Sequence, residues 1–215
     1  MPAADFAHVS NWVFDLDNTL YPPSARLFEL IEVRMTAYVM QSLGVDRPEA
    51  DRLRNAYWQR YGTTLAGLMR EHGVDPGPYL TEVHEISLAA LQPDPVLRAQ
   101  IAALPGRRFV FTNGSSSYAG KVLDARGLAG IFDGIYGVEH AGFHPKPDAA
   151  AYAAVFARAE IAPERAAMFE DDPRNLMVPH ALGMRCVHVA ETAVEAPHID
   201  HHTSDLAGFL ANLRR

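Results

Sequence analysis

Five short apolar runs constrain the fold of this chain more than any other feature of its sequence. Within each run the hydrophobic residues follow one another with little interruption, rather than alternating with polar residues. Such runs are typical of strands in a parallel sheet that is covered on both faces. Helix-like segments separate the later runs, so we predict a doubly wound, Rossmann-like α/β fold with a parallel sheet. The five predicted strands are residues 12–17, 108–113, 134–139, 166–171 and 185–190.

The segment after the first predicted strand has a different pattern. Residues 23–92 contain helix-like stretches and no strand-like run. We therefore expect an all-helical insertion at 23–92, while residues 1–22 and 93–215 together form the α/β core. The predicted helices of the insertion are residues 25–44, 47–62, 64–73 and 78–91.

Composition argues against several classes of function. The net charge is −7 in a chain of 215 residues, which does not suit a nucleic-acid polymer because its partners use Lys and Arg to displace phosphate counterions. A small phosphorylated ligand at one local site is compatible with that charge. We find no signal peptide and no apolar run near the ~20 residues of a membrane span. The single cysteine, Cys186, fits a reducing compartment, so we expect a cytoplasmic protein with no membrane partner.

Polar side chains gather where four of the predicted strands end. In a doubly wound sheet, ligands bind in the crevice beyond the carboxyl ends of the strands. Three of the groups are acidic or hydroxylic, and a lysine follows the remaining strand. This pattern indicates one shared site. The groups are Asp15, Asp17, Asn18 and Thr19; Thr112, Asn113, Gly114 and Ser115; Lys146; and Glu170, Asp171 and Asp172.

The acidic groups point to a divalent cation. Asp15, Asp17 and the acids at 170–172 would repel one another if they packed together without one. Mg²⁺ binds through oxygen, using few carboxylates together with water and substrate phosphate. Asp15 can offer a side-chain oxygen and Asp17 its backbone carbonyl, which leaves the Asp17 carboxyl free for proton transfer.

The other two groups suit a phosphate. Thr112 supplies a hydroxyl and Asn113 a side-chain amide, and Gly114 lies where backbone N–H groups are exposed at a helix start. Lys146 adds a positive charge that can lie between phosphate and carboxylate. The residues alone therefore predict a site for Mg²⁺ and a phosphate group.

Four stretches resemble the motifs of the haloacid dehalogenase-like (HAD) hydrolase superfamily: "DLDNTLYP", "FTNGS", the lysine of "HPKPD", and "FEDDPRN", in that order. The resemblance covers residues 10–22 and 93–192. A helical insertion directly after the first motif resembles the C1 cap class. The stretches "DNTLYP", "YGTTLAGL" and "PDPVLRAQIAALPGRRFVFTNGS" are most similar to the pyrimidine 5′-nucleotidase branch.

The resemblance implies a role for each group. Asp15 is the nucleophile that forms an aspartyl-phosphate, and Asp17 is the general acid and base. Asp15, the Asp17 carbonyl and Asp171 hold Mg²⁺, with Glu170 bound directly or through water. Dehalogenases of this superfamily lack a carboxylate at the position of Asp17, so this residue points to phosphoryl transfer. The residues that bind the transferring phosphoryl group are Thr112, Asn113, Gly114 and Lys146.

These inferences predict a Mg²⁺-dependent phosphatase of a small phosphorylated metabolite. A pyrimidine nucleoside 5′-monophosphate is the first substrate to consider, and a sugar phosphate or a phosphoglycolate-like ester is the alternative. A phospho-ligand sensor without catalysis is the non-enzymatic alternative, although binding alone would not need the Asp17 carboxylate. In the insertion, Thr63 and Thr64 interrupt a helical region with exposed hydroxyls, so we expect them to contact substrate.

Two polar clusters have weaker assignments. Asp172 falls where the motif needs no further ligand, and we expect it to support the metal ligands indirectly or to cap the next helix. His198, His201 and His202 lack the Cys/His frame of a zinc motif. We favour a loop that leads to the last helix over a metal-ligand cluster at these histidines.

Overall fold

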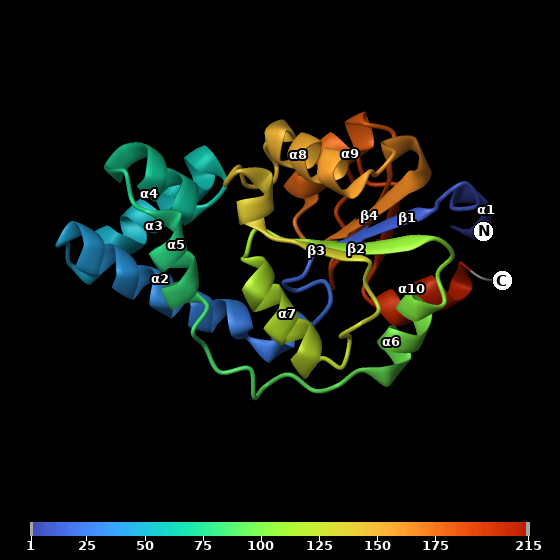
Figure 1. The fold of residues 1–215 in the computed structure, drawn as a ribbon, viewed down its shortest axis with the longest axis horizontal. Coiled ribbons are helices and arrows are strands. Elements are labelled where there is room, and N and C mark those ends of the chain that lie inside the picture. The colour runs from blue at the N-terminus through green and yellow to red at the C-terminus, as the bar shows by residue number, and fades with distance from the viewer. Residues whose placement is uncertain (1, 214–215) are drawn as a thin grey trace.

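The computed structural model describes residues 2–213 and contains a six-stranded sheet in which all neighbouring strands are parallel (Figure 1). The strand order β3-β2-β1-β4-β5-β6 reverses direction between β1 and β4. In doubly wound sheets, ligands bind at this reversal. The strands are β1 (Asn11–Phe14), β2 (Arg107–Phe111), β3 (Gly134–Tyr136), β4 (Ala166–Glu170), β5 (Arg185–Val189) and β6 (His201–Thr203).

Helices cover both faces of the sheet, as Figure 1 shows. Trp12 and Phe14 belong to one apolar cluster, which includes residues of α6, α7 and α10. Val13 belongs to a second cluster, which includes residues of α8 and packs against Val178 of α9. Successive side chains of β1 therefore point to opposite layers. The predicted doubly wound α/β fold is confirmed. The helices are α6 (Pro95–Ala102), α7 (Ser116–Ala125), α8 (Ala149–Ala159), α9 (Met177–Ala181) and α10 (Leu206–Asn212).

Four helices between β1 and β2 form a separate apolar cluster, centred on buried residues such as Val39, Leu68 and Val83. We call these four helices the helical insertion. They lie beside one end of the sheet in Figure 1. Among the helices of residues 2–213, none combines the length and the apolar character that a membrane span needs. The insertion comprises α2 (Leu27–Leu43), α3 (Arg47–Tyr61), α4 (Thr64–His72) and α5 (Pro76–Val83).

The remaining helical elements are short. A helix near the N-terminus and four 3₁₀ turns connect the larger elements. They are α1 (Pro2–Asp5), η1 (Pro23–Ala25), η2 (Val138–Ala141), η3 (Pro163–Arg165) and η4 (Pro173–Leu176).

The strands end earlier than predicted, and this places the polar residues in turns. The first predicted strand, 12–17, ends at Phe14, and the second, 108–113, ends at Phe111. Asn18 has a φ of 59°, a left-handed conformation that Asn tolerates and that a strand cannot continue through. The chain therefore turns directly after the buried part of each strand.

The last helix of the insertion is shorter than predicted. The sequence pattern predicts a helix over 78–91, but α5 ends at Val83. The Nδ1 atom of His84 lies 2.8 Å from the Leu80 carbonyl oxygen. This carbonyl is the one that the His84 backbone N–H would bond in a continued helix. The side chain therefore replaces the next helical hydrogen bond, and the chain leaves for the core.

The predicted loop at the C-terminal histidines is wrong in part. His201 and His202 lie in β6, which pairs with β5. His202 Nε2 lies 2.8 Å from the Ala190 carbonyl oxygen, and His201 Nε2 lies 3.2 Å from Asp5 Oδ2. A three-residue polar strand has no hydrophobic period, so backbone pairing alone defines it. The last helix, α10, is capped by Asp205, whose Oδ1 atom accepts from the Gly208 N–H at 2.9 Å.

Candidate active site

Asp15 and Asp17 lie in the turn that follows β1. The Asp15 backbone N–H still donates to the Phe169 carbonyl at 2.9 Å, so the turn begins as an extension of the β1–β4 pairing. Asp15 is buried, and the Thr19 hydroxyl donates to its Oδ2 atom at 3.2 Å. The turn therefore holds the Asp15 carboxyl at the reversal of strand order.

Lys146 reaches the same point from the loop after η2. Its side chain is 1% exposed, and its Nζ atom lies 2.7 Å from Asp15 Oδ1, 2.6 Å from Glu170 Oε2 and 2.9 Å from the Phe111 carbonyl oxygen. These three acceptors use all three ammonium hydrogens. Burial acts to lower the pKa of Lys146, but the two carboxylates hold this pKa above its ordinary value. The lysine therefore remains a buried cation.

Three carboxylates converge beside this lysine. Oxygen atoms of Asp15, Glu170 and Asp171 all lie within 4.8 Å of one another. Burial, and then the neighbouring Glu170, raise the pKa of Asp15 to about 8. Burial also raises the pKa of Glu170 to about 8 and that of Asp171 to about 6. One ammonium does not neutralise three desolvated carboxylates, and their oxygens match the ligands of a hard divalent cation. The donor set therefore fits Mg²⁺.

The turn after β2 supplies hydroxyl and N–H groups. Thr112 is fully buried, and its hydroxyl lies 3.4 Å from Asp17 Oδ2 and accepts from the Gly114 N–H at 2.9 Å. The Asn113 side chain bonds both backbone groups of Lys146, at 2.7 and 3.1 Å. In this structure the Asn113 amide therefore holds the lysine loop in place. The contact of Asn113 with a phosphate stays a prediction.

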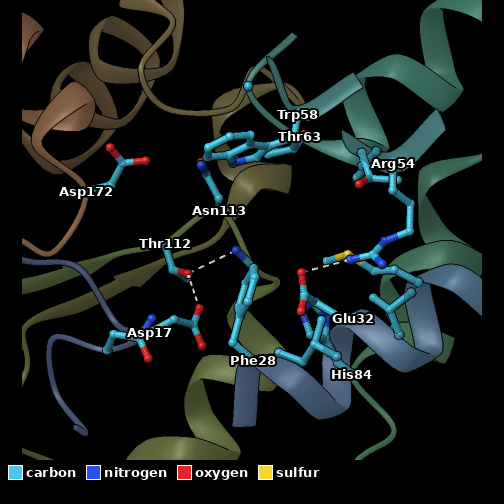
Figure 2. A pocket seen from close by; sticks show the side chains of 18 of the residues that line it. Asp17, Phe28, Glu32, Arg54, Trp58, Thr63, His84, Thr112, Asn113 and Asp172 are labelled. Carbon is cyan, nitrogen blue, oxygen red and sulfur yellow. Dashed lines mark hydrogen bonds and ion pairs between the residues drawn. The ribbon is translucent and has the colours of Figure 1, made fainter. Parts of the chain in front are cut away.

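A cavity of about 410 Å³ joins these groups to the helical insertion. Figure 2 shows Asp17 and Thr112 on the core side and the Arg54–Glu32 ion pair on the side of the insertion. Phe28 and Trp58 line the cavity and remain 42% and 47% exposed. Each of the ten residues predicted for the site, except Lys146, lines this cavity: Asp15, Asp17, Thr63, Thr64, Thr112, Asn113, Gly114, Glu170 and Asp171.

Comparison with known proteins agrees with this site. The family model described as haloacid dehalogenase-like hydrolase matches residues 12–183, which include the four motif stretches and the insertion. The chain belongs to this hydrolase family.

The relatives of this HAD hydrolase differ in their named activities. It is 31% identical to phosphate metabolism protein 8 of Saccharomyces cerevisiae over 132 residues, which are 57% of this chain and 41% of the yeast protein. The match thus spans less than half of that relative. CbbY from Rhodobacter sphaeroides, solved in complex with phosphate, has a TM-score of 0.65 and 22% identity over 96% of this chain and all of CbbY.

The fold of this chain is also similar to that of a dehalogenase. The 2-haloacid dehalogenase of Pseudomonas syringae pv. Tomato has a TM-score of 0.62 and 19% identity, covering 96% of this chain and 99% of the dehalogenase. Fold similarity therefore does not separate the two chemistries. In this HAD hydrolase, the distinction between phosphatase and dehalogenase chemistry has to come from the side chains that line the cavity.

Two tyrosines that were not predicted as site residues contact Asp17. The Tyr21 and Tyr118 hydroxyls donate to Asp17 Oδ1 at 2.6 and 2.9 Å. Burial, and then the Asp17 charge, raise the pKa of both phenols well above the ordinary value. Tyr21 lies four residues after Asp17 in the first motif and was a local signal. Tyr118 lies far along the chain, so only the fold brings it to Asp17.

Asp172 lies at the cavity but has other partners. Its Oδ1 atom accepts from the Arg174 N–H at 3.0 Å and thereby caps η4, as the sequence analysis expected. Its carboxylate also pairs with the Arg174 guanidinium at 2.5 Å. These donors occupy both Asp172 oxygens, whereas Asp171 and Glu170 converge with Asp15. Thr63 likewise caps a helix, accepting from the Ala66 N–H at 3.1 Å, while it faces the cavity.

Proposed function

We propose that this HAD hydrolase is a Mg²⁺-dependent phosphomonoesterase that works through an aspartyl-phosphate. The observation that carries the proposal is the Asp17 carboxyl, which lines the same cavity as the buried Asp15 and whose Oδ2 atom accepts no bond from the two tyrosines. A carboxyl at this position can move a proton, which ester cleavage needs and simple binding does not.

Asp15 supplies the nucleophilic oxygen. Its attack forms an O–P bond and breaks the ester O–P bond, while Asp17 gives its proton to the leaving oxygen. Asp17, now a carboxylate, then takes a proton from the water that cleaves the aspartyl-phosphate and regenerates Asp15. Lys146 and Thr112 stabilise the phosphoryl oxygens. Asp15, Asp171, Glu170 and the Asp17 carbonyl would hold Mg²⁺, which would supply positive charge to the phosphoryl group.

For the substrate, we propose a nucleoside 5′-monophosphate, and among these a pyrimidine one. The cavity of about 410 Å³ has room for more than a phosphate. The half-exposed rings of Phe28 and Trp58 offer aromatic surface for a planar group. The helical insertion would then act as a C1-type cap that covers the substrate, with Thr63 and Thr64 facing it. The resemblance to the pyrimidine 5′-nucleotidase branch supports the same choice.

A substrate panel with and without Mg²⁺ tests the proposal. It would include p-nitrophenyl phosphate, UMP, CMP, purine monophosphates and sugar phosphates. We expect Mg²⁺-dependent release of phosphate, its loss in Asp15→Asn, and full activity in Asp124→Asn, a matched control on the exposed side of α7. Absence of turnover with every ester would overturn the phosphatase and leave a phospho-ligand binding protein. A preference for sugar phosphates would overturn only the nucleotide assignment.

A further inference from the structure

We propose that Tyr21, Tyr118 and His84 form a positioning stack that orients the Asp17 carboxyl and ties it to the end of the helical insertion. This inference rests on the proposed phosphomonoesterase function. It assigns positioning roles to three residues that do not touch the reacting atoms.

The two oxygens of the Asp17 carboxyl have unequal numbers of hydrogen bonds. Oδ1 accepts two phenolic hydrogen bonds, from Tyr21 at 2.6 Å and from Tyr118 at 2.9 Å. Among the described residues, only the Thr112 hydroxyl approaches Oδ2, at 3.4 Å. Two short bonds to one oxygen fix the rotation of the carboxyl group. They leave Oδ2 as the oxygen that exchanges a proton with the substrate.

The core holds both tyrosines rigidly. Both side chains are 1% exposed and belong to the large apolar cluster beneath the sheet. Tyr21 comes from the turn after β1, whereas Tyr118 comes from the first turn of α7. The Asp17 carboxyl is therefore held from two independent elements of the core.

Tyr118 also contacts a residue at the end of the helical insertion. The His84 and Tyr118 rings stack with centroids 4.3 Å apart and planes inclined by 9°. His84 directly follows α5 as its C-cap, and its Nδ1 lies 2.8 Å from the Leu80 carbonyl and 3.3 Å from Ser115 Oγ. The Leu80 carbonyl only accepts, so Nδ1 carries the hydrogen. The ring is thus fixed by a bond to α5 and by contact with the core.

The consequence is a mechanical connection between the insertion and the proton-transfer group. A shift of α5 relative to the core moves the His84 ring, which is stacked on the phenol that holds Asp17 Oδ1. Without the His84 ring against it, the Tyr118 phenol loses one packing face and holds the Asp17 carboxyl less firmly. This couples closure over the substrate to proton transfer.

Leaving groups of different basicity test the role of Tyr118. An aliphatic phosphate ester needs a proton on its leaving oxygen, whereas p-nitrophenolate departs without one. In Tyr118→Phe we expect kcat/KM for glycerol phosphate to fall roughly tenfold and kcat/KM for p-nitrophenyl phosphate to change less than about twofold. Asp17 also activates water for hydrolysis of the aspartyl-phosphate, so this second step should slow in Tyr118→Phe. The kcat and KM for p-nitrophenyl phosphate should then fall together, and an initial burst of p-nitrophenol should appear as the aspartyl-phosphate accumulates.

Tyr21→Phe removes the other bond to the same oxygen and repeats the test if Tyr118→Phe does not fold. The matched control is Tyr38→Phe in α2, a tyrosine that does not line the cavity. An equal loss of kcat/KM with both esters, or no loss of kcat/KM with either ester, would overturn the positioning role. If the wild-type chain hydrolyses neither ester, the proposed function itself fails, which is a separate outcome.

Paired substitutions at His84 test the stack. We expect His84→Ala to reproduce the leaving-group dependence of Tyr118→Phe, and His84→Phe to restore most of the lost kcat/KM because a flat ring can still stack on Tyr118. A change confined to KM in His84→Ala, equal for both esters, would show that His84 contacts substrate and would overturn its link to Asp17. Thermal unfolding of each variant identifies losses that come from misfolding.

Discussion

Lys146 Nζ lies 2.7 Å from Asp15 Oδ1, and both side chains are almost completely buried. Within residues 2–213, Lys146 is the one cation that bonds to the three converging carboxylates. It therefore favours the ionised form of the nucleophile within a site whose burial disfavours that form.

Replacing this lysine is expected to shift the pH dependence of the reaction. In Lys146→Met, the carboxylates of Asp15 and Glu170 lose the charge that lowers their pKa. Because the pKa of Asp15 then rises above its value of about 8, the nucleophile is protonated over a wider range. We expect kcat/KM to fall at least roughly 100-fold at neutral pH, with the acidic limb of its pH profile displaced to higher pH.

The matched control for this variant is Lys121→Met, which changes an exposed lysine on α7. Profiles of kcat/KM against pH for both variants check the prediction. An acidic limb that stays in place in Lys146→Met would show that the lysine does not set the ionisation of Asp15.

The carboxylate cluster also predicts how stability depends on pH without metal. The pKa values of Asp15 and Glu170 are raised to about 8, and that of Asp171 to about 6. The folded chain therefore binds more protons than the unfolded chain between about pH 4 and about pH 8, so the free energy of unfolding from these groups falls as pH rises through that window. Mg²⁺ binds the ionised carboxylates, and its stabilising effect should grow over the same range.

Melting temperatures at about pH 5, 6.5 and 8, with EDTA or with excess MgCl₂, measure this effect. We expect the difference between the two conditions to increase with pH and to shrink in Asp171→Asn. A Mg²⁺-induced shift that is largest at the lowest pH would contradict the assignment of the cluster as the metal site.

How far the sequence predicts the site depends on whether a signal is local. Asp15, Asp17, Thr112, Lys146 and Glu170 follow predicted strands, and parallel strands bring their carboxyl ends to one edge, so strand order alone gathers these residues. Tyr118 offers no such signal, because its hydroxyl reaches Asp17 only through the packing of α7 against the sheet.

The errors in the fold have the same cause. The helix pattern continues past Val83, yet a side-chain hydrogen bond from His84 ends α5. The strand β6 is polar and exists through its pairing with β5. Propensity and periodicity describe neither interaction, since both depend on what the tertiary structure places nearby.

Two adjacent acids after β4 are expected to behave differently. Asp171 converges with Asp15 and Glu170, whereas Asp172 is bound by Arg174 and caps η4. We expect Asp171→Ala to raise the Mg²⁺ concentration for half-maximal activity at least roughly tenfold. Asp172→Ala should change it less than about threefold and lower the free energy of unfolding by about 1 kcal/mol through the lost cap. Mg²⁺ titrations and chemical denaturation of both variants measure these effects. If Asp172→Ala showed the effects expected of Asp171→Ala, and the reverse, the assignment would be wrong.

Trp58 should affect substrate binding more than the chemical step. Its ring lines the cavity and is 47% exposed, while the Arg174 guanidinium lies 4.0 Å from the ring centroid. Under the proposed function, the ring binds the leaving group equally before and during reaction. We therefore expect Trp58→Ala to raise KM roughly tenfold with kcat within about threefold. Trp58→Phe should retain most of the affinity because a smaller ring remains.

The stacked arginine allows a control for this variant. Arg174→Gln removes the cation and leaves the indole in the cavity, so its KM should stay within about twofold of the wild-type value if the ring itself contacts substrate. A KM that rises equally in Arg174→Gln and Trp58→Ala would show that the stacked pair, which joins α3 to the core, acts by holding the insertion in place. Steady-state kinetics with the preferred substrate of the panel distinguish the two results.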